Sequence, residues 1–398
     1  MPFTFRNQPL KAFYMTGAIC LLIFVRIPIW TIRYILPSGR PSRRWSLGRS
    51  LIVSSLHTLI DLMYSTALLQ SPPLEKLAEE GTDSGFVWVE ATPSLIAGDI
   101  LEKAKQNGVE AVRTAGFWFG ERGPDGMVGQ RAKSDELVFY HLHGGAYVMG
   151  AAHPSNSANK TLWNGLLEHS KIARLFALEY RLSSAPPFPS RNPFPAALIE
   201  AIAGYRYLVH DVGFDPSNII ISGDSAGGNL AYALARYMSA KEYGHELPRP
   251  GAVLLLSPTV DWTDTHTGPE SSMQRNTRTD FVHSIFTSRY TYNALRGNLP
   301  SSEIATNSWI SPASLKLKDS DTRGIFEGFP RTLIVSGALE MTLDPMRTLR
   351  DRMVADMGGN AVRYMEVPES THDFLIQGWH EPERTETLKE IGRWVEGL

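Results

Sequence analysis

Cysteine is almost absent from this chain of 398 residues. Its single cysteine, Cys20, excludes an intramolecular disulfide and a zinc site built from cysteine and histidine. An excess of charge is missing too, because the formal net charge is −2 at pH 7, and nothing favours nucleic acid or an acidic polymer as a partner. The chain has neither an internal repeat nor a glycine loop of the kind that cradles phosphate. We expect no metal and no organic cofactor.

Apolar residues are plentiful, at 43% of the chain, which suffices for one sizeable globular core. Strand-like segments alternate with helical ones from about residue 85 onward. The segments are 86–90, 112–119, 137–142, 173–180, 218–222, 251–256, 332–336 and 361–367. This alternation predicts an α/β protein in which helices cover both faces of a mostly parallel sheet. In such a sheet the loops at the carboxyl ends of the strands carry the chemistry.

The most informative motif follows the strand predicted at 218–222 and reads G-D-S-A-G-G over 223–228. Glycines on both sides of Ser225 let the chain turn sharply and lift the hydroxyl clear of the sheet edge. A G-x-S-x-G match alone is weak evidence, because small residues gather in ordinary turns. Between a strand and a helix-forming stretch, however, it predicts that Ser225 is the nucleophile of a serine hydrolase.

A pair of glycines follows the strand predicted at 137–142, in the sequence H-G-G-A-Y over 143–147. Adjacent glycines let backbone N–H groups point into one concavity, where they stabilise the negative oxygen of a tetrahedral intermediate. We predict that the N–H groups of Gly144, Gly145 and Ala226 form this oxyanion hole. His143, directly before the glycines, is expected to shape the loop and not to act as the base.

A serine hydroxyl needs a base that accepts its proton, and His372 follows the strand predicted at 361–367. The acid that orients this histidine is expected after the strand at 332–336, where two carboxylates stand. Glu340 is closer to the strand end and is our first choice. Asp344, one helical turn further along, is the alternative acid or a second carboxylate that supports the first.

Together these motifs resemble the hormone-sensitive-lipase-like branch of the α/β-hydrolase superfamily. The loop at 143–147 and the turn at 223–228 match its pattern, and so do Y-R-L at 180–182 and F-P-A-A-L at 194–198. The similarity covers about residues 135–380. It implies the α/β-hydrolase fold, with a mostly parallel eight-stranded sheet, helices on both faces and a helical cap.

One departure from the branch affects the acid. Its members usually have aspartate in a D-P-L-x-D pattern, whereas this chain has Glu340 at the first acidic position and Asp344 at the second. The register therefore favours Glu340 as the orienting acid.

The N-terminal region shows no motif of the branch. An apolar run covers 12–25 and, after Arg26, a second apolar stretch covers 27–32. Together they amount to about 20 residues, near the length that crosses a hydrocarbon core. We predict an uncleaved single-pass membrane anchor within residues 1–40, with an interfacial helix or a signal peptide as the alternatives.

Location and domain limits follow from weaker patterns. Basic residues are more numerous after the apolar run than before it, which favours the cytoplasmic face, whereas a glycosylation sequon at 159–161 would matter only in a lumenal domain. The endoplasmic reticulum membrane is the predicted compartment, with its face left open. Residues 41–84 are expected to form cap helices, and residues 85–398 the catalytic domain, with a cap insertion at about 261–300.

The predicted activity is hydrolysis of a carboxylic ester through an acyl-enzyme. A membrane anchor beside an esterase suggests a lipophilic substrate such as a sterol, terpenoid or other secondary metabolite, and the resemblance implies a short acyl group such as acetyl. Acyl transfer to an alcohol uses the same residues and stays open. The alternative outside catalysis is a small-molecule receptor on the same fold. No pattern indicates the oligomeric state.

Overall fold

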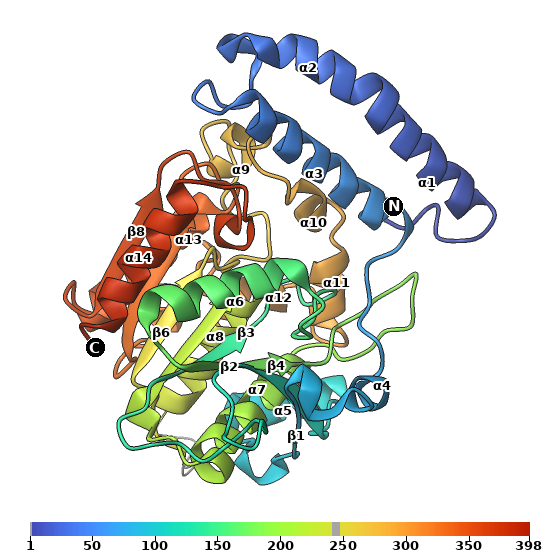
Figure 1. The fold of residues 1–398 in the computed structure, drawn as a ribbon. Coiled ribbons are helices and arrows are strands. Elements are labelled where there is room, and N and C mark those ends of the chain that lie inside the picture. The colour runs from blue at the N-terminus through green and yellow to red at the C-terminus, as the bar shows by residue number, and fades with distance from the viewer. Residues whose placement is uncertain (1, 241–246) are drawn as a thin grey trace.

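An eight-stranded sheet forms the centre of the protein in a computed structural model, which describes residues 2–240 and 247–398 (Figure 1). The strands are β1 (Phe86–Val89), β2 (Thr114–Gly120), β3 (Val138–Leu142), β4 (Arg174–Glu179), β5 (Ile219–Asp224), β6 (Ala252–Leu256), β7 (Arg331–Gly337) and β8 (Val362–Val367). Each lies within two residues of a strand predicted from the sequence. The predicted α/β architecture is thereby confirmed.

The strand order is β1-β2-β4-β3-β5-β6-β7-β8. Strand β2 runs antiparallel to both of its neighbours, and every pair from β4 to β8 is parallel. The parallel strands therefore end at one edge of the sheet. The loops that follow β3, β5, β7 and β8 meet at this edge, where the predicted functional residues lie.

Helices cover both faces of this sheet. Along β5, Ile219 and Ile221 contribute to one buried core and Ile220 to another, because successive side chains of a strand face opposite sides. One core lies under α7 (Ala196–Arg206) and α8 (Ala226–Ser239), and the other under α6 (Ser157–Ser170) and α14 (Glu383–Val395). Further helices are α4 (Leu74–Ala78), α5 (Gly98–Asn107) and α13 (Leu343–Met357).

A long connection joins β6 to β7, and the part of it around Phe281 lies beside the carboxyl edge of the sheet. It holds four short α-helices, which are α9 (Ser272–Arg275), α10 (His283–Thr287), α11 (Tyr290–Arg296) and α12 (Glu303–Thr306). Helix α10 packs against the N-terminal helix α3 (Leu47–Thr66), and the Ser284 hydroxyl donates a hydrogen bond to Asp61 across this contact. Two segments far apart in the sequence thus lie side by side over the sheet edge (Figure 1).

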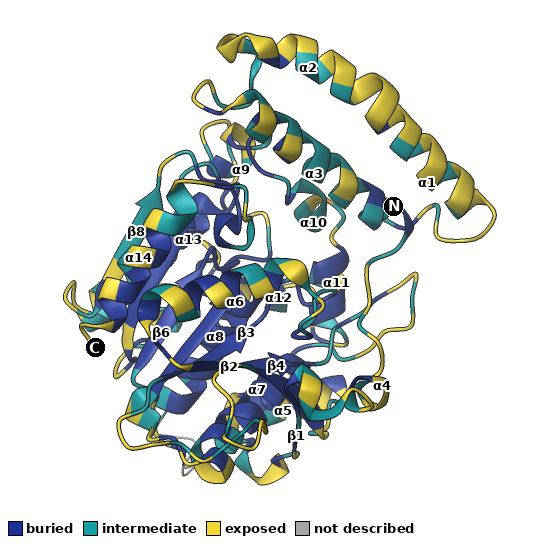
Figure 2. Cartoon of the chain, viewed as in Figure 1, coloured by how far each residue is buried: buried dark blue, intermediate teal, exposed yellow. Residues whose placement is uncertain are grey.

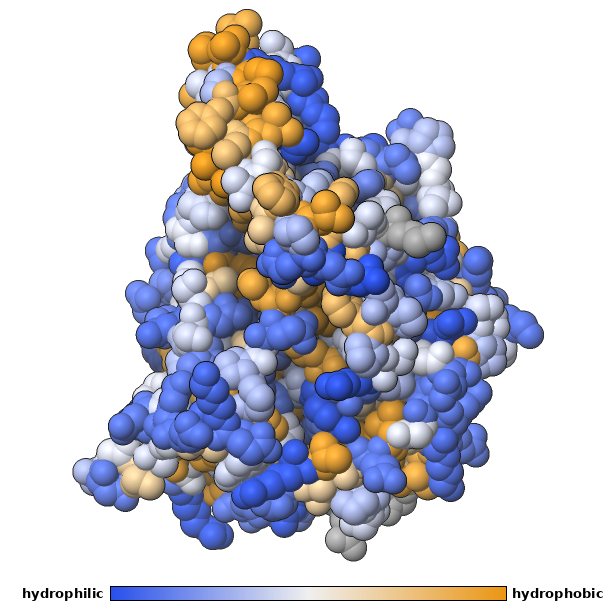
Figure 3. Space-filling model, turned by 90° about the vertical axis from the view of Figure 1, so that its right-hand side faces the viewer, coloured by the Kyte–Doolittle hydropathy of each residue, from blue (hydrophilic) through white to orange (hydrophobic). Residues whose placement is uncertain are grey.

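The N-terminal apolar residues form one long helix, Leu10–Ile35. It consists of α1 (Leu10–Leu21), a π-helical turn (Leu22–Arg26) and α2 (Ile27–Ile35), and it runs along α3 (Figure 1). The guanidinium of Arg26, the one charge between the two apolar stretches, donates to the hydroxyl of Thr58 on α3 at 3.1 Å. Most of α1 and α2 is exposed, and hydrophobic side chains gather at this end of the molecule (Figures 2 and 3).

Candidate active site

Ser225 stands at a sharp turn between β5 and α8. Its backbone has φ 52° and ψ −115°, a conformation that non-glycine residues rarely adopt and that recurs at strained functional turns. The Ser225 N–H donates to the carbonyl of Leu256 at 2.9 Å, which fixes the turn to the neighbouring strand. A Cβ at Gly223 would overlap the backbone of Gly227, and one at Gly227 would overlap the carbonyl of Leu142. The glycines around the serine are therefore required by close backbone approach.

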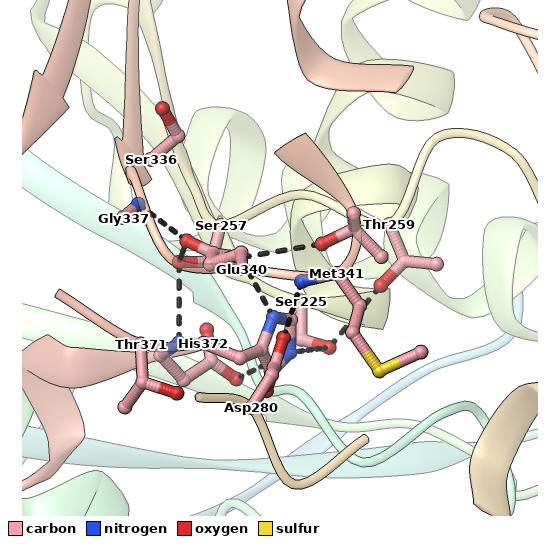
Figure 4. A network of polar contacts seen from close by, with 12 residues as sticks. Ser225, Ser257, Thr259, Asp280, Ser336, Gly337, Glu340, Met341, Thr371 and His372 are labelled. Atoms are coloured by element: carbon pink, nitrogen blue, oxygen red, sulfur yellow. Dashed lines mark hydrogen bonds and ion pairs between the residues drawn. The ribbon is translucent and has the colours of Figure 1, made fainter. Parts of the chain in front are cut away.

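Three side chains from three loops form a continuous hydrogen-bonded chain (Figure 4). Oγ of Ser225 lies 2.9 Å from Nε2 of His372, and Nδ1 of the same imidazole lies 2.8 Å from Oε2 of Glu340. All three side chains are buried. The structure thus brings together the three residues that the sequence predicts as nucleophile, base and acid, in the order that serine hydrolysis requires.

The carboxylate of Glu340 is held by several donors. Its Oε1 accepts from the Ser257 hydroxyl at 2.7 Å and from the Gly337 N–H, and its Oε2 accepts from Thr342 at 3.2 Å. Such donors fix the orientation of the carboxylate. The other oxygen, Oε2, is thereby aimed at the imidazole.

The alternative acid, Asp344, lies elsewhere. Its carboxylate accepts from the N–H of Ser272 at 2.7 Å and pairs with Arg347 at 3.4 Å. It makes no contact with His372 in the described structure, and the prediction that Asp344 is the orienting acid is wrong. The reason is positional, because Asp344 is in the first turn of α13, where its carboxylate faces α9.

The oxyanion loop differs from the prediction at one residue. The N–H of Gly144 donates to Oδ2 of Asp224 at 3.0 Å, so the prediction that Gly144 contributes to the oxyanion hole is wrong. The N–H groups of Gly145, Ala146 and Ala226 have no acceptor within residues 2–240 and 247–398. The loop turns through left-handed conformations, with φ 116° at Gly145 and 56° at Ala146. Sequence reasoning missed Ala146, whose N–H has no acceptor among the described residues, whereas that of Gly144 is engaged.

Asp224 explains this shift by one residue. It is buried, and a buried carboxylate needs hydrogen-bond donors to offset its lost hydration. One oxygen contacts Nε2 of His141 at 3.0 Å, while the other accepts from Gly144. Nδ1 of His141 in turn contacts the Ser222 hydroxyl at 2.9 Å. The aspartate of the G-D-S-A-G-G motif is the signal in the sequence that would have pointed to this tether.

His143 has the structural role expected of it. Its Nδ1 contacts the carbonyl of Gly144 at 2.7 Å, and its ring stacks on Tyr180 at a centroid distance of 4.3 Å. Burial lowers the pKa of His143 to about 4, so the ring is neutral at physiological pH. His143 therefore supports the loop as a neutral, packed side chain.

The profile of a protein family described as alpha/beta hydrolase fold matches residues 139–376. The chain belongs to this family. Its sequence is 29% identical to an acetyl-hydrolase of Streptomyces hygroscopicus, over 65% of this chain and 74% of the relative. It is also 28% identical to the esterase LipU of Mycobacterium tuberculosis, over 64% of this chain and 76% of the relative.

Solved structures place this α/β hydrolase in the same branch. A hormone-sensitive lipase from a metagenome library matches with a TM-score of 0.53 and 28% identity, over 71% of this chain and 82% of that one. An esterase of the bacterial hormone-sensitive lipase family matches with a TM-score of 0.56 and 22% identity, over 89% and 98%, a likeness that shows the fold. The resemblance to the hormone-sensitive-lipase-like branch is thus confirmed.

The hydrolase has a further acid beside its histidine that sequence reasoning missed. Oδ2 of Asp373 lies 3.3 Å from Nε2 of His372, the nitrogen that faces Ser225. The other oxygen, Oδ1, is buried and has no hydrogen-bond partner in the described part of the chain. Its only signal in the sequence is its place directly after the histidine.

Charges around His372 favour the imidazolium. Burial alone lowers the pKa of His372. The negative charges of Asp373, Glu340 and Asp280 raise it by more than burial lowers it, so the pKa lies at about 10. Burial also raises the pKa of the Asp373 carboxyl well above its usual range, although the imidazolium opposes this. Asp280 accepts from the N–H of Met341 at 2.6 Å, and burial raises its pKa to about 6 (Figure 4). His372 therefore has a carboxyl group beside each of its two ring nitrogens.

A cavity of about 750 Å³ opens beside Ser225. Ile60 of α3 forms part of its wall, and Phe281, Val282 and Ile285 of the β6–β7 connection form another part. Among the aromatic residues of this connection, Phe281 lines the cavity, whereas Phe286 packs on Trp262 and Tyr290 packs on Phe3. Within the described ranges, no group of three or more His, Cys, Asp or Glu side chains is arranged to hold a metal ion.

Proposed function

We propose that this protein is a serine esterase that removes a short acyl group, such as acetyl, from a lipophilic alcohol. It is a carboxylic ester hydrolase, the class to which its named relatives belong. The observation that carries the proposal is the hydrogen-bonded chain from Ser225 through His372 to Glu340, beside three backbone donors that have no acceptor among the described residues. The acetyl group is suggested by the relatives named acetyl-hydrolase.

In the proposed mechanism, Oγ of Ser225 attacks the ester carbonyl while Nε2 of His372 takes the hydroxyl proton. Glu340 stabilises the imidazolium. The N–H groups of Gly145, Ala146 and Ala226 stabilise the oxyanion of the tetrahedral intermediate.

As the intermediate collapses, the alcohol leaves with the proton from His372, and the acyl group stays on Ser225. Water then attacks the acyl-enzyme while His372 again takes a proton. The carboxylic acid is released, and the proton returns to Oγ of Ser225.

The shape of the cavity supports a lipophilic alcohol such as a sterol or terpenoid. Aliphatic and aromatic side chains from α3 and from the β6–β7 connection line part of it. Its volume lies within the usual range for sites that enclose small ligands. We assign residues 41–84 and the insertion that includes 261–300 to a helical cap, and the rest of 85–398 to the catalytic domain. The contact between α3 and α10 supports this division, because it closes the two pieces over the cavity.

We also propose that the protein works at a membrane, with the endoplasmic reticulum as its compartment. The exposed apolar helix within residues 1–40 supports the membrane, and the basic residues after it favour the cytoplasmic face. The sequon at 159–161 does not oppose this face. Asn159 is buried and its side-chain amide donates to the carbonyl of Ala151 at 2.9 Å, so a glycan there would require α6 to open.

The experiment compares the purified full-length protein with Ser225→Ala and with Ser320→Ala, an exposed serine that serves as the matched control. Nitrophenyl esters of increasing acyl length and a panel of acetylated sterols and terpenoids are the substrates, and the released acid and alcohol are identified. We expect the wild type to hydrolyse acetate esters fastest. Ser225→Ala should lose this activity, and Ser320→Ala should keep it. Full activity of Ser225→Ala would contradict the mechanism, and a preference for long acyl chains would contradict the substrate class.

A further inference from the structure

The helix Leu10–Ile35 presents an unusually large apolar surface. It is long and apolar enough to cross a membrane, and of its 26 residues only Leu22 and Tyr34 are buried. Phe13, Phe24 and Ile32 are 74%, 73% and 73% exposed, and Leu10, Ile29, Ile35 and Leu36 are exposed as well. Soluble proteins rarely expose a continuous apolar surface of this size. Hydrophobic side chains crowd the same end of the molecule in Figure 3.

The chain before this helix is bound to the globular body. Phe3 is 0% exposed, and its ring lies among the rings of Tyr64, Phe188 and Tyr290 at centroid distances of 6.0, 4.9 and 4.7 Å. The N–H of Phe3 donates to the carbonyl of Tyr64 at 2.7 Å. The N-terminal end of the helix is therefore fixed next to the C-terminal end of α3.

The chain after the helix is bound to the same body, close to the catalytic residues. Trp45 is 1% exposed, and its indole N–H donates to the carbonyl of Glu369 at 2.9 Å. The Ser42 hydroxyl donates to the carboxylate of Glu369 at 2.5 Å, and Arg278 donates to the carbonyl of Gly39 at 3.0 Å. Glu369 is three residues before the catalytic histidine. The C-terminal end of the helix is thus fixed as firmly as its start.

A helix that crosses a bilayer has its ends on opposite sides of about 30 Å of hydrocarbon. Here both ends bind one globular body, and between them Tyr34 contacts the Ser54 hydroxyl of α3 at 3.0 Å. A single pass, the geometry expected from the sequence, would require one flank to leave its buried position. We propose that Leu10–Ile35 lies in the plane of an anionic lipid bilayer surface, with both ends and the hydrolase body on the same side.

The charges at the two ends of the helix suit this partner. Arg6 precedes the helix, Arg33 is in its last turn, and Arg43 and Arg44 follow it, all with exposed side chains. Arginines at the border of an apolar surface reach the phosphate headgroups while the apolar face enters the acyl chains. The inference refines the proposed membrane association and does not depend on ester hydrolysis.

This placement also explains why α3 lies between the long helix and the catalytic cavity. Ile60 of α3 lines the cavity beside Ser225, while Leu62 and Thr58 of α3 line a groove against the long helix. A bilayer that covers the long helix therefore lies one helix away from the nucleophile. A lipophilic ester dissolved in the bilayer is brought close to the cap without crossing water.

The native cysteine supplies a direct test, because Cys20 is exposed, lies near the middle of the helix and is the only cysteine of the chain. A nitroxide attached to Cys20 of the full-length protein is measured for depth in vesicles of phosphatidylcholine and phosphatidylserine. In-plane binding predicts a depth of about 5 to 10 Å below the headgroups. A depth near the bilayer centre, about 15 Å, would overturn the proposal. Absence of vesicle binding in a flotation assay would overturn it too.

A second measurement compares how readily the two flanks of the helix are labelled in sealed vesicles. Arg6→Cys and Arg43→Cys are each made in a Cys20→Ser background and labelled with a maleimide that cannot cross the membrane. We expect detergent to change the labelling yield of the two positions equally, because both lie on the same side of the membrane. Labelling of one position only after the vesicles are opened would contradict the proposal. Fluorophosphonate labelling of Ser225 in the same samples reports separately on the proposed esterase site, so that the two proposals fail independently.

Discussion

The carboxyl group of Asp373 offers the sharpest perturbation of this site, because it lies beside Nε2 of His372, the nitrogen that faces Ser225 in the proposed mechanism. A neutral imidazole is required to accept that proton, so kcat/KM falls as the pH falls through the pKa of His372. An anionic Asp373 favours the imidazolium and raises this pKa. Asp373→Asn removes the charge, and we expect the acid limb of the pH profile to move to lower pH.

The magnitude follows from the distance. Two unit charges 3.3 Å apart attract each other by about 5 kcal/mol at an effective dielectric constant of about 20, which corresponds to about 3.7 pH units. This is an upper limit, because burial raises the pKa of Asp373 and reduces its charge. We therefore expect the limb to move by about 1 to 3 pH units. The backbone φ of 48° at this position suits asparagine as well as aspartate, so the fold is preserved.

The assay is the pH dependence of kcat/KM for nitrophenyl acetate, measured for wild type, Asp373→Asn and Asp344→Asn. The range is about pH 5 to 11, so that it extends above the pKa of about 10 of His372 in the wild type. Asp344 is a matched control because it is a carboxylate of the same region without contact to the imidazole. We expect its profile to overlay that of the wild type. An unchanged acid limb in Asp373→Asn, or a limb at higher pH, would refute the role assigned to this carboxylate.

Three further results are expected from steady-state kinetics on purified variants. Ser225→Ala should lower kcat by several powers of ten, as losses of a nucleophile do, and a value within tenfold of the wild type would exclude it as the nucleophile. Glu340→Gln should lower kcat by about 10⁴-fold, whereas Asp344→Asn should stay near wild type, and the reverse order would reassign the acid. Asp224→Ala should lower kcat by about 10²-fold with little change in KM, because Gly144 loses its tether and the oxyanion donors shift; a change in KM alone would show that the tether affects binding only.

The fold was predictable because its strands carry local signals. Short β-branched runs such as 219–221 are buried on both faces of a parallel sheet and are easily recognised in the sequence. The limits of the cap insertion, predicted at about 261–300, have no comparable local signal. The strand after the insertion was predicted at 332–336 and is β7, and short helices and turns continue from residue 300 up to it.

Parts of the site depend on contacts that no local pattern encodes. Ser225 and His372 follow recognisable strands, and the turn that holds each is short. The donor set of the oxyanion hole, in contrast, depends on which N–H the carboxylate of Asp224 engages, across 80 residues of chain. The approach of Asp373 to the imidazole depends on a left-handed backbone at one position. Such details are set by tertiary packing.

The central claim is that Ser225 is a nucleophile activated by His372. Its most direct test is the intact mass of the protein after reaction with a fluorophosphonate, followed by peptide mapping, for wild type, Ser225→Ala and His372→Ala. The proposed mechanism predicts one covalent adduct on Ser225 in the wild type, none in Ser225→Ala, and a much slower reaction in His372→Ala. An unreactive wild-type protein, or an adduct at another serine, would contradict it.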